Sequence, residues 1–93
     1  MSIQDIAAKL KSRVESSGFD RSVKFDTGVD GVIVIDGGTI STVDAPADCT
    51  IKLSLSSFED LIAGDLSPTT AFMTGKIKVE GDMSVAMALQ SLL

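Results

Sequence analysis

The last eleven residues, 83–93, contain no charged side chain. Only three of them are polar, and Asp82 stands just before the segment, where it can cap a helix. A helix that covers a protein surface normally carries charges on its outer face. This helix therefore needs apolar neighbours around most of its circumference, although it is too short to cross a bilayer.

Several neighbours could cover such a helix: the sheet on one side, and on another a bound ligand, a partner subunit or the helices expected at 57–63 and 68–73. Three of the four methionines, Met73, Met83 and Met87, lie in the last 21 residues. Methionine is flexible and often lines surfaces that adapt to variable shapes, but it also fills gaps in ordinary cores. The methionines favour a ligand only in combination with the uncharged helix.

The spacing of apolar residues alternates between helical and strand periods along the chain. We expect helices at 3–16, 57–63, 68–73 and 83–92, and strands at 23–26, 32–35, 39–43, 49–55 and 76–80. Ser56 with Glu59 resembles a capping box at the start of the second helix, and Gly64 suits its end. The strands at 23–26, 49–55 and 76–80 each have one polar face. The pattern predicts a two-layer α/β sandwich, formed as a single domain over residues 1–93, with helices on one face of the sheet.

Composition excludes several function classes. The net charge is −5, from 8 basic and 13 acidic residues, and the chain has no basic cluster of the kind that binds nucleic acid. It has no histidine, which argues against acid–base catalysis, so we predict no enzyme activity, no catalytic residues and no cofactor. The segment 26–31 begins like a calcium loop, but Gly28 and Gly37 stand where ligands are needed, so we expect a hairpin turn and no metal site.

Cys49 is the only cysteine, so no disulfide can form within the chain. No histidine can activate its thiol, and we expect a structural role for it. The first residues show neither the basic nor the apolar region of a signal peptide. Together these features predict a cytoplasmic protein.

The second half of the chain resembles the sterol carrier protein type 2 domain family. The resemblance is specific over residues 44–93 and, over 1–43, extends only to the order of the elements. The motif that carries it is Ala71-Phe72-Met73-Thr74-Gly75-Lys76-Ile77-Lys78-Val79-Glu80-Gly81-Asp82-Met83, followed by Ala86-Met87-Ala88-Leu89-Gln90.

The resemblance implies a five-stranded, mostly antiparallel sheet covered by helices, with an apolar tunnel between the two layers. It also implies that the chain binds fatty acids, acyl-CoA esters, phospholipids or sterols and transfers them without altering them. By position, the residues implied at or near the tunnel are Phe58, Leu61, Ile62, Phe72, Met73, Ile77, Val79, Met83, Met87 and Leu89. The spacing alone places these residues on the covered side of the sheet but predicts no tunnel.

Two further interpretations remain open. Lys9, Lys11 and Arg13 give helix 3–16 a basic face, which is either simply solvated or makes transient membrane contact. The segment 32–35 is apolar on both faces and, with the last helix, would also suit a structural or oligomerisation module packed on a partner. We expect a lipid ligand and a monomer or weak dimer.

Overall fold

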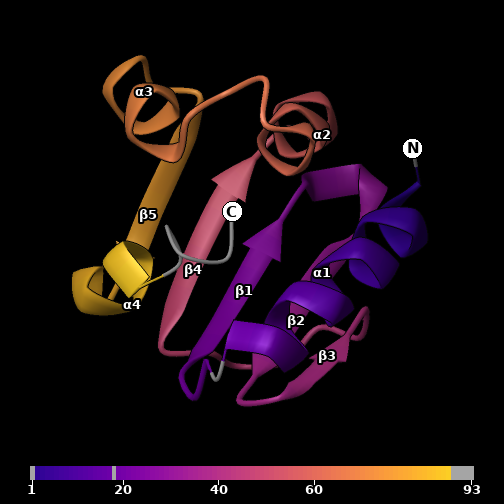
Figure 1. Cartoon of the computed structure of the whole chain (residues 1–93). Helices are drawn as coiled ribbons and strands as arrows, with labels where there is room; N and C mark the ends of the chain where they lie inside the picture. Colours follow the sequence, from indigo (N-terminus) through magenta and orange to yellow (C-terminus); the bar gives the residue numbers. More distant parts are fainter. Residues whose placement is uncertain (1, 18, 89–93) are drawn as a thin grey trace.

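The computed structural model describes residues 2–17 and 19–88, apart from the side chain of Ser17. Over these residues, helices lie on one face of a five-stranded sheet (Figure 1). The elements in chain order are α1 (Ile3–Ser17), β1 (Ser22–Asp26), the 3-10 helix η1 (Gly28–Asp30), β2 (Val32–Asp36), β3 (Thr39–Ser41), β4 (Cys49–Leu53), α2 (Leu55–Ala63), α3 (Pro68–Met73), β5 (Ile77–Gly81) and α4 (Met83–Ala88). The predicted two-layer architecture is confirmed.

The sheet has the strand order β3-β2-β1-β4-β5. Three of its four strand pairs are antiparallel, and β1 with β4 is the parallel pair. The chain leaves the end of β1, forms β2 and β3 on one side of it, and returns to place β4 on the other side. The expectation of a mostly antiparallel sheet is therefore confirmed, and β1 is its middle strand.

Alternation along the strands separates a buried face from a polar face. In β1, Val23 and Phe25 are fully buried beneath the helices, whereas the residues between and beside them are half-buried polar side chains. In β4, Cys49, Ile51 and Leu53 are buried in the same way. The core is thus the apolar layer between the sheet and the helices, which the apolar stripe of α1 joins through Ile6 and Leu10.

Several local signals in the sequence form as expected. Ser2 and Asp5 make a reciprocal capping box at the start of α1, with N···O distances of 3.1 and 3.2 Å. Gly64 ends α2 in the left-handed conformation, with φ of 84°. Pro68 occupies the first turn of α3. Each of these short-range interactions depends on residues a few positions apart, which is why the sequence predicts them well.

Three predicted boundaries are wrong by two residues, and several others by one. β3 ends at Ser41 instead of residue 43, and β4 ends at Leu53 instead of residue 55. The cap of α2 is Ser54, whose Oγ accepts a hydrogen bond from the Ser57 N–H at 3.2 Å, and not Ser56. The apolar Leu55 continues the alternation of β4 in sequence, but the cap at Ser54 places it in the first turn of the helix. The predicted end of the last helix near residue 92 lies outside the described residues.

β2 bears on the oligomerisation hypothesis. Ile33 and Ile35 face the core, and Val34 points to the opposite, otherwise polar face of the sheet. Val34 is only 5% exposed, so the chain itself buries it. The second apolar face of this strand therefore needs no partner subunit.

Replacing Ser54 with Ala should destabilise the protein by about 1 kcal/mol, because the N-terminal N–H groups of α2 lose their side-chain acceptor. The control Ser56→Ala should change the free energy of unfolding, measured by urea denaturation, by less than about 0.5 kcal/mol. An equal or larger loss in Ser56→Ala would contradict the cap seen here.

Replacing Gly81 with Ala should destabilise the protein by about 2 kcal/mol or more, because the residue has positive φ and no room for a side chain. Its φ is 99°, and a Cβ atom there would lie 2.5 Å from the backbone oxygen of Asp48. Gly38, which has open space around its Cβ position, is the matched control. Urea denaturation of Gly38→Ala should show little loss, and equal losses in both variants would contradict the steric explanation.

Candidate ligand-binding site

The floor of the candidate site consists of buried apolar side chains from α2 and the sheet. Phe58, Leu61 and Ile62 of α2 and Ile77 of β5 all belong to the buried core. The ring of Phe58 stacks on that of Phe25 in β1, with 4.7 Å between the ring centroids. We refer to Phe58, Leu61, Ile62 and Ile77 as the floor.

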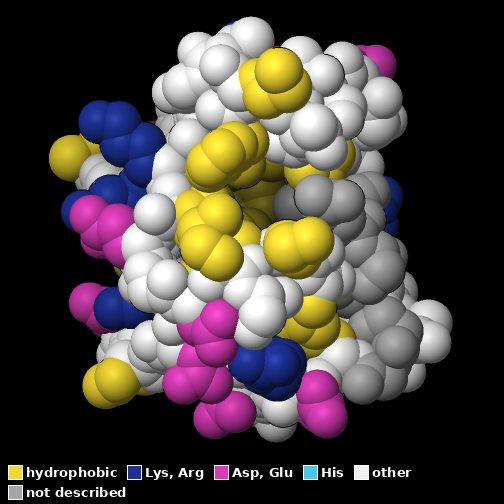
Figure 2. Space-filling view, turned by 90° about the vertical axis from the view of Figure 1, so that its left-hand side faces the viewer, with side chains coloured by type: hydrophobic (Ala, Val, Ile, Leu, Met, Phe, Trp, Pro, Cys, Tyr) yellow, Lys and Arg dark blue, Asp and Glu magenta, His cyan; other side chains and the backbone are white. Residues whose placement is uncertain are grey.

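On the two helices that flank β5, four large hydrophobic side chains are exposed. They are Phe72 and Met73 of α3, at 50% and 79% exposure, and Met83 and Met87 of α4, at 49% and 68%. We refer to these four residues as the rim. Figure 2 looks onto the side of the molecule formed by α3, β5 and α4 and shows a hollow surrounded by hydrophobic side chains.

Two helices position the rim along one strand. α3 precedes β5, α4 follows it, and both contact it. α4 also packs on β4 and β1, through the fully buried Val85. Figure 1 shows the two helices near opposite ends of β5, so the rim residues come from both ends of the strand.

The structure thus divides the residues suggested by the family resemblance into two sets. Four form the floor and four form the rim, while Val79 is half-buried against the core. Leu89 lies outside the described residues. The sequence placed all of them on the covered side of the sheet, without separating buried residues from exposed ones.

From the sequence, we expected apolar neighbours around most of the circumference of the last helix. The described part of this helix, Met83–Ala88, does not meet that expectation. Val85 is the only buried residue there, and the two methionines are exposed. Their side chains point away from the sheet contact that buries Val85. The uncharged helix therefore leaves an apolar side open among the described residues.

The site offers apolar contact rather than polar chemistry. Within residues 2–17 and 19–88, the only buried polar residue is Thr27, whose Oγ1 donates to the Gly31 carbonyl at 2.6 Å and is thereby satisfied. The same residues contain no group of three or more His, Cys, Asp or Glu side chains that could hold a metal ion. No helix in this part of the chain is long and apolar enough to span a membrane.

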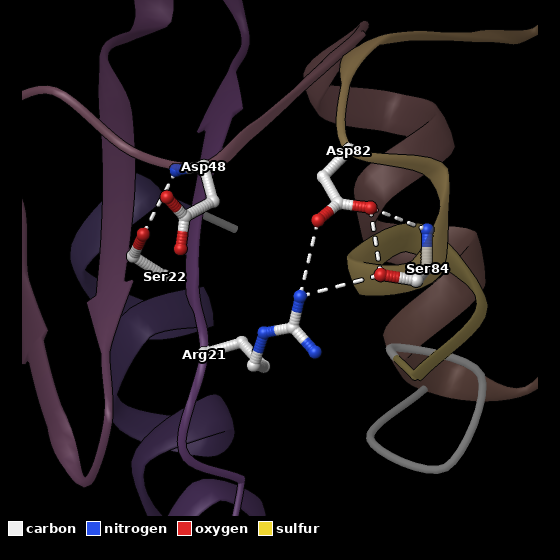
Figure 3. A network of polar contacts seen from close by, with 5 residues as sticks. All are labelled: Arg21, Ser22, Asp48, Asp82 and Ser84. Atoms are coloured by element: carbon white, nitrogen blue, oxygen red, sulfur yellow. Dashed lines mark hydrogen bonds and ion pairs between the residues drawn. The ribbon is translucent and has the colours of Figure 1, made fainter.

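A polar network fixes the start of α4 (Figure 3). The Nη2 of Arg21, just before β1, donates to Asp82 Oδ2 at 3.1 Å and to Ser84 Oγ at 3.2 Å. Ser84 in turn donates to Asp82 Oδ1 from its N–H at 2.9 Å and from its hydroxyl at 2.6 Å. The Asp82 N–H donates to the Asp48 carbonyl at 3.0 Å, so the helix that carries half of the rim is tied to the segments entering β1 and β4.

Two arginines, Arg21 in this network and Arg13 elsewhere, make contacts that had no signal in the sequence. Arg21 lies 61 residues from its partner Asp82, and Arg13 of α1 donates to the Ile62 carbonyl at 2.8 Å, 49 residues away. Contacts at such separations leave no periodic pattern. Ser84 follows the capping Asp82 at the spacing of an Asx turn, which is a local signal that could have indicated its role.

Hydrogen bonds from Ser84, and then the charge of Arg21, lower the pKa of Asp82. A carboxylate whose pKa is lower in the folded than in the unfolded state stabilises the fold above its unfolded pKa, and this contribution is lost as the pH falls through the folded value.

Asp82→Asn should therefore reduce stability at pH 7, and the difference from the wild type should shrink below about pH 4. Urea denaturation over this pH range, with Asp65→Asn on another part of the surface as the control, measures the effect. A deficit that is constant with pH would contradict it.

Cys49 is fully buried at the start of β4, opposite Gly81. Burial is the larger cause that raises the pKa of its thiol, and the nearby negative charge of Asp82 raises it further. A raised pKa keeps the sulfur protonated and unreactive near neutral pH. The thiol therefore behaves as a core side chain, as expected from the sequence.

Solved structures share this architecture. A crystal structure of Sterol Carrier Protein 2 Like 2 from Aedes aegypti superposes with a TM-score of 0.78 at 22% identity, covering 100% of this chain and 97% of that one. A solution structure of palmitated SCP2L2 from the same species gives a TM-score of 0.80 at 22% identity, covering 99% and 94%. At this identity the structures establish the fold.

Sequence comparison establishes the family. Sterol carrier protein 2 of Homo sapiens is 43% identical over 56 residues, which are 60% of this chain and 10% of that protein. The chain thus spans about a tenth of the length of the curated relatives that it matches. The model of the SCP-2 sterol transfer family matches residues 5–93. The chain belongs to this family, whose members bind and transfer lipids.

Proposed function

We propose that this chain binds a lipid between the rim and the floor and transfers it without chemical change. The observation that carries the proposal is the exposed apolar rim on the side of the molecule where hydrophobic side chains surround a hollow (Figure 2), together with the buried apolar floor. The ligand class is fatty acids, fatty acyl-CoA esters, phospholipids or sterol-like lipids. The tunnel would lie within a single domain over 1–93. Its proposed lining is Phe58, Leu61, Ile62, Phe72, Met73, Ile77, Val79, Met83, Met87 and Leu89.

The energetics of apolar burial support this choice of ligand. Each methylene transferred from water contributes about 0.8 kcal/mol, so a long acyl chain has a gross gain on the order of 10 kcal/mol. Association and ordering costs reduce this gain. A net value of about 8 kcal/mol corresponds to micromolar affinity. Such binding requires no charged anchor, in agreement with the apolar character of the rim and the floor.

A fatty acid is the most direct first probe. A relative of the same fold is known in a palmitated form, from Aedes aegypti. The exposed thioethers of Met73, Met83 and Met87 can adjust to the shape of different chains, which supports a broad rather than a narrow ligand range. The methionines thus suit a carrier of several lipids.

Titration of the protein with a fluorescent fatty acid should show saturable binding at micromolar concentration. Met87→Glu should weaken this binding at least about tenfold, because the new carboxylate must lose water when the ligand covers it. Met87→Leu should keep most of the affinity. Val43→Glu is the matched control, since it adds the same charge at an exposed valine between β3 and β4.

Absence of saturable binding by the wild type would contradict the proposed function. Unchanged affinity in a folded Met87→Glu variant, with folding checked by thermal unfolding, would show that α4 does not line the site. A comparable loss in Val43→Glu would indicate an effect of net charge alone.

The alternative is a structural or oligomerisation module. The exposed Met83 and Met87 favour it, because an apolar helix side can also pack on a second subunit. The other argument for such a module was the second apolar face of β2, and the burial of Val34 within the chain removes that argument. Sedimentation equilibrium distinguishes the two functions: a stable dimer that takes up no fatty acid favours the module.

A further inference from the structure

We propose that α3 is a lid, which swings away from the sheet to admit the lipid and closes again over it, while α4 stays in place. The lid comprises the helix, its N-cap and the turn that follows it, residues 67–76. This inference rests on the proposed function, because it identifies how a lipid reaches the floor. It gives the two halves of the rim different roles, since the half on α3 moves and the half on α4 is fixed.

The first observation is that the floor is closed to solvent. Its four residues are between 0% and 8% exposed. A lipid that lies between the rim and the floor must therefore displace a part of the chain that now covers the floor. α3 is placed for this role, because it connects α2 to β5, the two elements that provide the floor. Its Ala71 belongs to the same buried cluster as the floor residues.

The second observation is how little holds the lid against the rest of the molecule. Ala71 is the only buried residue of the lid, and its side chain is a single methyl group. Among the described residues, no side chain of the lid is hydrogen-bonded or ion-paired to another element, and Thr74 Oγ1 donates to the Thr70 carbonyl within the lid at 2.8 Å. Because burial of one methyl group contributes little, the lid can open without loss of the core.

The lid is also built to move as one unit. The N–H of Ala71 donates to the Ser67 carbonyl at 2.8 Å, and the N–H of Thr74 donates to the Thr70 carbonyl at 2.9 Å. The N–H of Lys76 closes the turn by donating to the Ala71 carbonyl at 2.8 Å. All of these bonds lie inside the lid, so they persist when it swings.

Residues with fixed partners bound the lid on both sides. The N–H of Leu66 donates to the Asp60 carbonyl of α2 at 3.2 Å. Ile77, the first residue of β5, pairs with Leu53 in the sheet. The hinges are therefore the two junctions, where a few backbone torsions absorb the motion.

α4, in contrast, is held by a larger apolar side chain and by a ring of polar contacts (Figure 3). Val85 is fully buried. Arg21 pairs with Asp82 at 3.1 Å, and the Asp82 N–H donates to the Asp48 carbonyl at 3.0 Å. The Asp48 N–H donates to the Oγ of Ser22, the residue after Arg21, at 2.8 Å. These contacts join the segments that enter β1, β4 and α4, so α4 cannot swing without breaking several of them.

Thiol labelling without lipid tests which helix opens. Ala71→Cys and Val85→Cys each place a thiol at a fully buried position, one in the lid and one in α4. The thiol of Ala71→Cys should react with a maleimide at least about tenfold faster, because opening of the lid exposes it without wider unfolding. Mass spectrometry follows each site, with the rate in urea-unfolded protein as the reference for intrinsic reactivity. Cys49, fully buried in both variants, reports wider unfolding.

Stopped-flow mixing with a fluorescent fatty acid tests the lid in a second way. Ala71→Gly should raise the association and dissociation rates about fourfold each, because the closed lid loses its methyl contact whether or not lipid is bound. The affinity should stay within about twofold for the same reason. Thr70→Gly is the matched control, since it places a glycine at an exposed position of the same helix. It should change neither rate by more than about twofold.

Three results would overturn the proposal. Equal labelling of Ala71→Cys and Val85→Cys, at the rate of Cys49, would show that both positions open only on wider unfolding. Faster labelling of Val85→Cys would make α4 the moving helix. Fatty acid rates that do not change in Ala71→Gly, or that change equally in Thr70→Gly, would show that the buried methyl group does not hold the entrance closed. If Ala71→Cys does not fold, the two glycine variants decide.

The labelling experiment contains no lipid and is therefore independent of the fatty acid titration. Protein that takes up fatty acid but labels equally at the two positions would overturn the lid and leave the proposed function intact. Protein in which Ala71→Cys reacts fast but that takes up no fatty acid would overturn the proposed function instead.

Discussion

The parallel pairing of β1 with β4 is the constraint on which the rest of the structure depends. Four residues of each strand are in register, from Val23 opposite Cys49 to Asp26 opposite Lys52. β4 then provides the edge on which β5 pairs, and β5 carries a rim helix at each end. Because β1 comes from the first half of the chain, the site formed by the second half is supported by a strand that contributes no residue to the rim.

Most elements of this fold can be predicted from the sequence because their signals are local. The capping box at Ser2, the left-handed Gly64 and the alternation in β5 each involve residues a few positions apart. The boundary at Leu55 could not be predicted, since an apolar residue there satisfies a strand pattern and a helix pattern equally well. The antiparallel character of the sheet came from the family resemblance, because side-chain alternation is the same in parallel and antiparallel strands.

The candidate site shows the same limit. The sequence indicated which residues carry excess apolar character, but it could not distinguish a buried Phe58 from an exposed Met73. That difference depends on how far α3 and α4 stand from the sheet, which long-range contacts such as that of Arg21 with Asp82 help to set. The absence of charged residues from a helix indicates only that the helix needs some apolar neighbour. In the described part of the chain, that neighbour is the sheet on one side alone.

The sulfur chemistry of the chain follows from where its sulfur atoms lie. Cys49 is enclosed by the core, whereas the thioethers of Met73, Met83 and Met87 face outward at the rim. Peroxide therefore reaches the methionines before the thiol, and each sulfoxide formed places a polar oxygen on an otherwise apolar surface. Oxidative damage would alter the rim and leave the folded core unchanged, and reduction of the sulfoxides would restore it.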